Sequence, residues 1–371
     1  MRHTVQLSRY LLRLLWLLCL ASPTQAAEES LAPYQPRFGR ERPVVAVVGQ
    51  NRMTELADYV VPLGVLRRTG GAQVLALATV AEPIELMPAL SLQPDASIAE
   101  FRQRFPQGAD YLVVPAVHDS RDPLLLDFIQ QQAALGATLI GICDGVLPLA
   151  HAGLLPGRRA TGHWYSRSRR LKDFPDTLWQ EDRRYVVDGA LMTTSGVSAA
   201  LPASLALVEA IAGHTRASTL AREFGVASWS PEHHSQGFAL GVQGYLMAAG
   251  NYLARWRHER FAVTLHDGLD EIALALRVDA WARTFRTQVY GVAAHPVRSA
   301  SGLAFVPQRD GAGLPTLPGR QVDAAWAIDE ALDGIAERYG EATRRLVAAQ
   351  LEHAPAGSVN PVKGQIELHS P

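Results

Sequence analysis

Cys143 is the residue whose type and surroundings most clearly suggest chemistry. It stands at the centre of Gly141-Ile142-Cys143-Asp144-Gly145, a glycine–x–nucleophile–x–glycine pattern with cysteine where hydrolases often carry serine. A sharp turn from strand to helix would strain the backbone of the central residue, and the flanking glycines would relieve crowding there. The N-terminus of the following helix would favour the thiolate, which is the nucleophilic form. The pattern therefore predicts a cysteine nucleophile.

A parallel sheet is needed to position this turn. Apolar runs of strand length, typical of strands buried on both faces, occupy residues 43–49, 73–78, 109–115 and 137–142. Helical stretches follow them at 55–69, 122–135 and 144–152, and a further helix is expected at 203–212. Residues 185–192 carry an Asp-Gly turn between apolar runs, which predicts a hairpin. Strands alternating with helices predict an α/β fold with a doubly wound parallel sheet.

Several ordered motifs in this part of the chain resemble the ThiJ/PfpI superfamily, and most closely the amidase-like domain of some AraC-type regulators. The motifs are the elbow at 141–145, the segments 149–155 and 157–164, the first-helix segment 58–68 and the loop-to-helix segment 193–199. The resemblance covers about residues 43–213. It implies a flavodoxin-like sandwich that is usually homodimeric. Family members include deglycase or glyoxalase-like enzymes, isonitrile hydratases, a so-called intracellular protease and redox-responsive proteins.

The resemblance also assigns roles to individual residues. Cys143 is the expected nucleophile, Asp58 its acidic partner and His163 a candidate base or acid. An acid beside a thiolate must share a proton or be repelled, so the pKa of Asp58 should rise. A purely structural role stays open for each of these residues. Cys143 could be a buried, inert cysteine, Asp58 could simply satisfy a helix N-terminus, and His163 could be a loop histidine packed against Trp164.

Backbone groups and one further histidine complete the expected site. The N–H groups near Ala116 and Asp144 would stabilise developing negative charge, and His118, at the end of a strand, is a possible substrate-binding residue. No cofactor and no metal are expected. The adjacent Glu232, His233 and His234 lack a further spaced set of ligands and are expected in a solvated loop.

Three departures from the family pattern matter. Relatives often have Gly-Gly after the third buried strand, where this chain has Pro115-Ala116-Val117-His118, and a small residue or histidine where it has Asp144. Regulator-type relatives often have an acid where this chain has Pro202. A carboxylate about 4 Å from the thiolate would cost ~4 kcal/mol at an effective dielectric constant of about 20, more than the ~1 kcal/mol that a helix end supplies. The chain also lacks the His-x-Glu that related amidotransferases use to activate their cysteine.

Two functions therefore remain open. The first is a cofactor-independent hydrolase or lyase in which Cys143 attacks a small electrophile such as a carbonyl, an isonitrile or an amide-like carbon. The second is a non-catalytic protein that binds a ligand or senses oxidants through Cys143. In both cases the expected partner is a small molecule, with a homodimer as a possible assembly.

The N-terminal residues 1–26 resemble a secretory signal peptide, with a retained amphipathic anchor as the alternative. Three arginines flank and interrupt an apolar run at 11–21, and no acid precedes Glu28. Cleavage would remove Cys19, leave Cys143 as the single thiol and place the mature protein in the periplasm or outside the cell, free of the membrane. The loss of three arginines makes the net charge of −1 more negative, so nucleic acid is not an expected partner.

The remaining chain is divided by composition. Residues 27–42 are expected to be a linker, 43–213 the ThiJ/PfpI-like domain, 214–260 a helical connection, 261–354 a C-terminal α/β extension and 355–371 a flexible tail. Residues 261–310 repeat the strand–acid–helix–strand order of 44–78 without a cysteine, which suggests a partial repeat. The helix expected at 270–285 is too apolar to stand free, so it should pack against the first domain.

Overall fold

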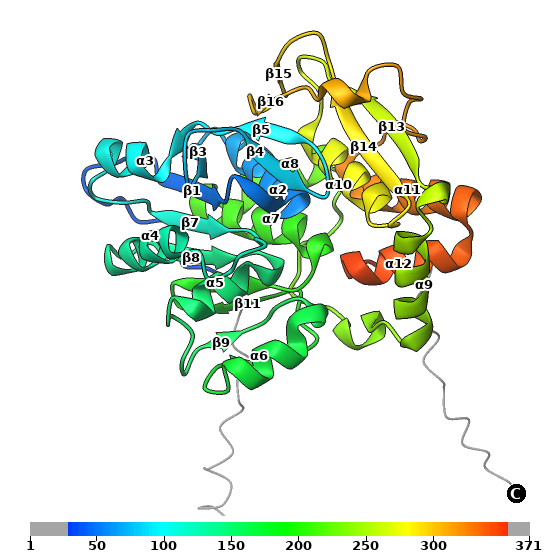
Figure 1. Cartoon of the computed structure of the whole chain (residues 1–371). Helices are drawn as coiled ribbons and strands as arrows, with labels where there is room; N and C mark the ends of the chain where they lie inside the picture. Colours follow the sequence, from blue (N-terminus) through cyan, green and yellow to red (C-terminus); the bar gives the residue numbers. More distant parts are fainter. Residues whose placement is uncertain (1–28, 355–371) are drawn as a thin grey trace, which may run out of the picture.

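A computed structural model describes residues 29–354 of the 371-residue chain (Figure 1). The expected signal peptide at 1–26 and the expected tail at 355–371 lie outside the described residues. In the part that is described, no helix is both long enough and apolar enough to cross a membrane. Residues 29–42, expected as a linker, lie against the first domain, where Arg40 forms an ion pair of 2.9 Å with the buried Asp110.

A seven-stranded sheet forms the centre of the first domain. Its strand order is β11-β12-β8-β7-β1-β3-β6, and every pairing is parallel except that of β11 with β12. The strands are β1 (Val44–Gly49), β3 (Gln73–Ala78), β6 (Ala96–Ser97), β7 (Tyr111–Val114), β8 (Thr138–Gly141), β11 (Tyr185–Asp188) and β12 (Leu191–Thr194). The predictions of a doubly wound parallel sheet and of a hairpin at 185–192 are confirmed.

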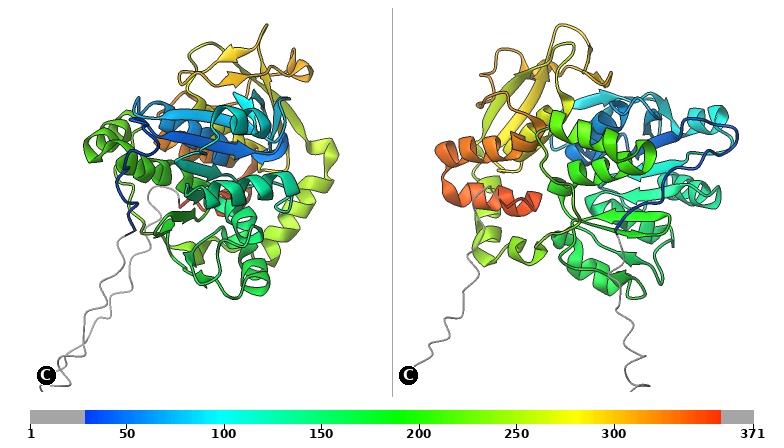
Figure 2. Two further views of the ribbon diagram at one scale, coloured as in Figure 1. Left: turned by 90° about the vertical axis from the view of Figure 1, so that its left-hand side faces the viewer. Right: turned by 180° about the vertical axis from the view of Figure 1, so that it is seen from behind.

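Helices cover both faces of this sheet (Figures 1 and 2). One face carries α2 (Leu56–Arg67), α7 (Ala200–Ala212) and α8 (His214–Glu223), and the other α3 (Ile98–Arg104), α4 (Pro123–Ala134) and α5 (Val146–His151). Side chains of β1 alternate between the two cores: Val45 and Val47 face the first, and Ala46 and Val48 face the second. The strand is apolar throughout because neither of its faces meets water.

Short elements at the edges were not expected from the sequence. A five-stranded sheet is built from β2 (Arg52–Glu55), β4 (Ile84–Met87), β5 (Ser91–Gln93), β15 (Val297–Arg298) and β16 (Ala304–Phe305). Two further strands, β9 (Arg159–Ala160) and β10 (Leu178–Trp179), flank α6 (Arg167–Asp173). Strands of two to four residues are too short to show a periodic pattern, so sequence periodicity does not reveal them.

The C-terminal region forms a second α/β unit. Its elements are α9 (Val242–Leu253), β13 (Glu259–Thr264), α10 (Glu271–Ala282), β14 (Thr287–Val292), α11 (Ala327–Tyr339) and α12 (Glu341–Leu351). β13 and β14 pair in parallel, and α10 connects them. β1 and α2 begin at residues 44 and 56, and β13 and α10 begin at 259 and 271 with the same lengths. β13 and α10 therefore begin the same number of residues after β1 and α2, respectively.

Helix α10 packs directly on α2 (Figure 1). The contact is close at Gly64, where a Cβ atom would lie 2.7 Å from side-chain atoms of both Glu271 and Ile272. This confirms the expectation that the C-terminal helix covers the first domain.

Ion pairs close both ends of this contact. Arg68, at the C-terminus of α2, lies 3.1 Å from Glu271 in the first turn of α10. Arg283, at the C-terminus of α10, lies 2.7 Å from Glu55 at the start of α2. Each helix thus gives an arginine to the N-terminal end of the other. This is the reciprocal pattern that two copies of one element make in an isologous interface.

The close approach at Gly64 predicts the effect of adding one methyl group. Alanine normally stabilises a helix relative to glycine by about 0.5–1 kcal/mol. In Gly64→Ala the methyl group would overlap Glu271 and Ile272, so we expect a net loss of about 1–3 kcal/mol in the free energy of unfolding, measured with urea. The control is Gly250→Ala in α9, where no atom lies within 4 Å of the new Cβ. Equal effects of the two substitutions would show that the helix contact at Gly64 can relax to admit a methyl group.

Candidate functional site

The turn after β8 has the geometry that the elbow pattern requires. Cys143 has a φ angle of +56°, in the left-handed region that residues with a side chain avoid. It opens a single 3-10 turn, Cys143–Gly145, that leads into α5. A Cβ atom at Gly145 would lie 2.0 Å from the Val114 carbonyl oxygen, so a side chain cannot be placed there. The Cys143 N–H donates to Thr194 Oγ1 at 2.9 Å, which fixes the turn to the end of β12.

The thiol of Cys143 is buried, with 6% of the residue exposed. Burial raises its pKa well above the ordinary value of 9.0, and the carboxyl groups of Asp58, Asp144 and Glu55 raise it further, whereas Arg283 opposes the shift. The expectation that the helix end would favour the thiolate is therefore wrong for the resting site. Desolvation together with three neighbouring acids outweighs the partial charge of a short helix.

Asp58 lies in α2 and is completely buried. Its Oδ2 accepts a hydrogen bond from the Ala116 N–H at 3.3 Å, and its Oδ1 has no partner. Burial raises its pKa from 3.8 to about 7, with Arg283 opposing this shift and Asp279 adding to it. The direction of the shift agrees with the prediction, but burial and not a neighbouring thiolate is its main cause. A carboxyl group with this pKa exists in both protonation states near neutral pH and can therefore exchange protons there.

Two more acids surround Arg283 beside Asp58. Arg283 donates through Nε to Asp279 Oδ1 at 2.8 Å and through Nη2 to Glu55 Oε1 at 2.7 Å. Glu55 also accepts the Asp58 N–H at 2.5 Å, which caps α2. Burial followed by the charges of Asp279 and Asp58 raises the pKa of Glu55 well above its usual range. The cluster therefore retains protons that exposed carboxyl groups would lose.

Arg283 was not foreseen as a site residue, because it belongs to the C-terminal region. Burial would lower the pKa of its guanidinium, but Asp279 and Glu55 outweigh burial and raise it, so the group stays charged. The only sequence signal was the shared pattern of acid at the start and arginine at the end of α2 and α10.

The remaining expected residues are placed differently. The Ala116 N–H is engaged by Asp58. The carboxylate of Asp144 accepts a hydrogen bond from Ser166 Oγ at 2.6 Å, and Arg170 Nε donates to that hydroxyl oxygen at 3.1 Å. Asp144 is thus held toward Ser166, while its charge still opposes ionisation of Cys143. His118 is exposed, and its backbone N–H donates to the Met53 carbonyl at 3.1 Å.

His163 uses both ring nitrogens in contacts with the backbone. Nδ1 accepts the Tyr165 N–H at 3.2 Å, and Nε2 lies 3.0 Å from the carbonyl oxygen of Gln350. An acceptor at Nδ1 and a carbonyl at Nε2 together select the neutral tautomer that carries its proton on Nε2. The ring also packs beside Trp164, with 5.3 Å between centroids. This arrangement favours a packing role, and a role in proton transfer stays a prediction.

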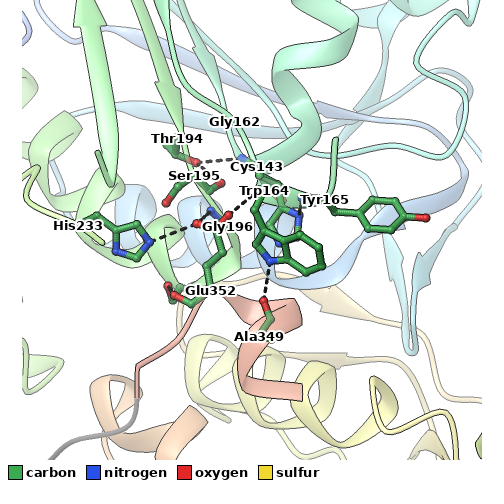
Figure 3. A network of polar contacts seen from close by, with 12 residues as sticks. Cys143, Gly162, Trp164, Tyr165, Thr194, Ser195, Gly196, His233, Ala349 and Glu352 are labelled. Carbon is green, nitrogen blue, oxygen red and sulfur yellow. Dashed lines mark hydrogen bonds and ion pairs between the residues drawn. The ribbon is translucent and has the colours of Figure 1, made fainter. Parts of the chain in front are cut away.

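Glu352, directly after α12, is a second residue that the sequence did not suggest. Its carboxylate accepts the N–H groups of Trp164 and Gly196 at 2.7 and 3.0 Å and lies 3.2 Å from His233 Nε2 (Figure 3). The expectation that His233 lies in a solvated loop is wrong, because 9% of its side chain is exposed. Glu352 and His233 also line a cavity of about 600 Å³ between the first domain and the C-terminal region.

Residues 29–354 contain no group of three or more His, Cys, Asp or Glu side chains arranged to hold a metal ion. The acids near Cys143 are instead compensated by Arg283 and by retained protons.

Comparison with known proteins relates the first domain to one family. Residues 44–210 match the DJ-1/PfpI family. An isonitrile hydratase of Pseudomonas putida is 38% identical over 94 residues, which cover 25% of this chain and 39% of that enzyme. The transcriptional regulator CdhR of Pseudomonas aeruginosa is 31% identical over 114 residues, which cover 31% of this chain and 34% of the regulator. The chain thus matches about a third to two fifths of these two relatives.

Relatives matched over nearly their whole length are more distant. The Parkinson disease protein 7 homolog of Danio rerio is 23% identical over 180 residues, covering 47% of this chain and 91% of that protein. Among solved structures, Drosophila melanogaster DJ-1beta has a TM-score of 0.46 and 22% identity, covering 50% of this chain and 99% of that one. A ThiJ/PfpI family protein of Pseudomonas syringae has a TM-score of 0.44 and 24% identity, with coverages of 51% and 80%.

The raised pKa of Asp58 predicts a pH-dependent cost to stability. Folded Asp58 binds its proton more tightly than unfolded Asp58, so its contribution to stability is present below pH 4 and is lost as the pH rises through about 7. Asp58→Asn removes this ionisation. We expect its gain in unfolding free energy over the natural protein to be larger at pH 8 than at pH 5, by about 2–3 kcal/mol. Asp127→Asn on the exposed face of α4 is the control, and an Asp58→Asn effect independent of pH would contradict the assignment.

Arg283 predicts the reactivity of the thiol. Its positive charge opposes the rise in the pKa of Cys143, so Arg283→Gln should leave less thiolate at a given pH and slow alkylation by iodoacetamide several-fold. Arg68→Gln breaks the matching ion pair at the other end of the α2–α10 contact. Both variants should lose stability, but only Arg283→Gln should slow alkylation. Equal slowing in both would show that Arg283 acts through packing alone.

Proposed function

Because residues 44–210 match the DJ-1/PfpI family, we propose that this protein is a cofactor-independent enzyme that uses Cys143 to attack a small electrophilic carbon compound. A cysteine-based activity fits the family, whose members similar to this chain include an isonitrile hydratase and DJ-1 homologues. The observation that carries the proposal is the strained elbow cysteine beside a buried carboxyl group with a pKa of about 7.

The two groups divide the chemistry between them. The resting cysteine is a thiol, so it must lose its proton when it attacks. Asp58 in its ionised form can take that proton and then deliver it to the substrate, because its pKa lies near neutrality. Arg283 offsets the negative charge that remains in the cluster. This coupling avoids a permanent thiolate in a buried, acidic environment.

An isonitrile is the substrate class that we propose first, because an isonitrile hydratase is among the relatives. The Cys143 sulfur bonds to the terminal isonitrile carbon, and Asp58 transfers the former thiol proton to the same carbon, giving a thioimidate. Water then adds across the carbon–nitrogen double bond, with its hydroxyl group on the carbon and its other proton on the nitrogen. The carbon–sulfur bond breaks, the hydroxyl oxygen becomes the formyl oxygen, and its proton returns to the sulfur. The net reaction adds one water to the isonitrile and releases an N-substituted formamide.

A non-catalytic ligand-binding role is the second candidate. Cys143 is buried and its pKa is raised, so it forms little thiolate. Both nucleophilic attack and oxidation by peroxide require the thiolate, and this favours a role in which Cys143 does not react. On this alternative the thiol would resist both peroxide and iodoacetamide in the folded protein. The cavity of about 600 Å³ would then hold the ligand.

Substitution of the nucleophile tests the enzyme directly. We expect Cys143→Ser to abolish turnover across a panel of isonitriles, glyoxals and amides, because a buried hydroxyl is a far weaker nucleophile than a thiol with an adjacent base. Product formation is followed by mass spectrometry, and circular dichroism checks that the variant folds.

His163→Gln serves as the comparison variant, since both nitrogens of His163 bind the backbone. We expect it to lose stability while the dependence of turnover on pH keeps its shape. Turnover unchanged in Cys143→Ser would reject the nucleophile, and a changed pH profile in His163→Gln would restore His163 as a proton-transfer group.

A further inference from the structure

The C-terminal end of α12 is attached to the loops around Cys143. Trp164 Nε1 donates to the Ala349 carbonyl at 2.7 Å, and His163 Nε2 meets the Gln350 carbonyl at 3.0 Å. Ser198 Oγ donates to the Glu352 carbonyl at 2.6 Å. These contacts join residues 349–352 to the loop after β9 and to the loop after β12. The second loop lies at the carboxyl end of a strand of the main sheet, where α/β sheets place their ligands.

Within this attachment the Glu352 carboxylate has the surroundings of a bound ligand. It is 1% exposed, and one oxygen accepts the Trp164 N–H while the second oxygen accepts the Gly196 N–H. His233 Nε2 supplies a third polar contact at 3.2 Å. The buried carboxylate is thus held by two backbone N–H groups and an imidazole, with no hydrogen bond from an arginine or lysine side chain.

The backbone geometry is adapted to this carboxylate. Glu352 has a φ angle of +50°, a left-handed conformation that glycine or asparagine would adopt more readily. A Cβ atom at position 196 would lie 2.7 Å from Cβ and Cγ of Glu352, so only glycine lets the side chain approach the N–H. The close contact between the Glu352 side chain and the loop at Gly196 therefore depends on the backbone conformation of Glu352 and on the absence of a side chain at position 196.

The carboxylate binds the loop that holds the elbow and also lines the cavity. Gly196 follows Thr194, whose hydroxyl accepts the Cys143 N–H, by two residues (Figure 3). Glu352 and His233 also line the cavity of about 600 Å³. A ligand that entered from the cavity and displaced Glu352 could place its own carboxylate on the same donors, with room for the rest of the molecule.

We propose that the N–H groups of Trp164 and Gly196, together with His233, form a carboxylate-binding subsite beside Cys143, and that Glu352 occupies it in the closed chain. The substrate class is then a small electrophile that carries a carboxylate. This deepens the proposed function and rests on it for Cys143 as the reacting group. Residues 349–352 act as an internal ligand that substrate must replace.

Removal of the Glu352 side chain with acetate as a substitute tests the subsite. Glu352→Ala deletes a methylene carboxylate, which acetate matches in size and charge. We expect the variant to melt about 5 °C lower and its Cys143 to react with iodoacetamide roughly tenfold faster. Sodium acetate should reverse both changes, whereas sodium chloride at equal ionic strength should not. Glu337→Ala on the exposed part of α11 is the control and should respond to neither salt.

Each result decides the proposal. Wild-type melting and alkylation in Glu352→Ala, or losses that acetate does not reverse, would overturn the subsite. If Glu352→Ala does not fold, Glu352→Gln keeps the size and removes the charge. We expect faster alkylation there too, and wild-type behaviour would overturn the proposal.

The same experiment in a Cys143→Ser background separates the subsite from the enzyme. Recovery of the melting temperature by acetate in the Cys143→Ser, Glu352→Ala double variant needs only the three donors. If acetate restores the melting temperature of the double variant but the natural protein shows no turnover, the subsite is retained and the proposed reaction is rejected. If the natural protein shows turnover but acetate does not restore the melting temperature, the reaction is retained and the subsite is rejected.

Discussion

Compensation of buried charge by Arg283 is the interaction on which the site depends. Glu55, Asp58 and Asp279 are all buried close to one guanidinium. Buried acids without a counter-charge would either bind protons completely or destabilise the fold by several kcal/mol. With Arg283 present, the pKa of Asp58 comes to about 7 rather than rising further. The arginine therefore sets the protonation state in which Cys143 meets a substrate.

This charge comes from a region without a nucleophile of its own. β13 and α10 repeat the lengths and spacing of β1 and α2, and the two helices exchange arginines with each other's N-termini. The C-terminal unit thus covers α2, which is buried along nearly its whole length. Through the same contact it supplies Arg283, the positive charge of the cysteine site. Fold stability and site chemistry share the α2–α10 interface.

A second contact joins the same region to the loops around the site. Residues 349–352 are attached to the loops at Trp164 and Gly196, and in our proposal the Glu352 carboxylate controls access to Cys143. The first domain therefore contributes the nucleophile and its neighbouring acid, while the C-terminal region contributes the compensating cation and a cover. Neither half contains the complete site.

The sequence by itself determined the local features. The apolar runs fixed the buried strands, and the two glycines around Cys143 fixed the elbow, because a side chain at Gly145 would collide with the neighbouring strand. A rise in the pKa of Asp58 was also expected from the sequence, but its main cause is burial, which only the tertiary structure supplies. Tertiary structure alone decided the state of the thiol and the partners of His163, His233 and Asp144. The burial and the electrostatic surroundings of these side chains depend on residues such as Arg283 and Glu352. Those residues are distant in sequence and leave no periodic pattern near Cys143.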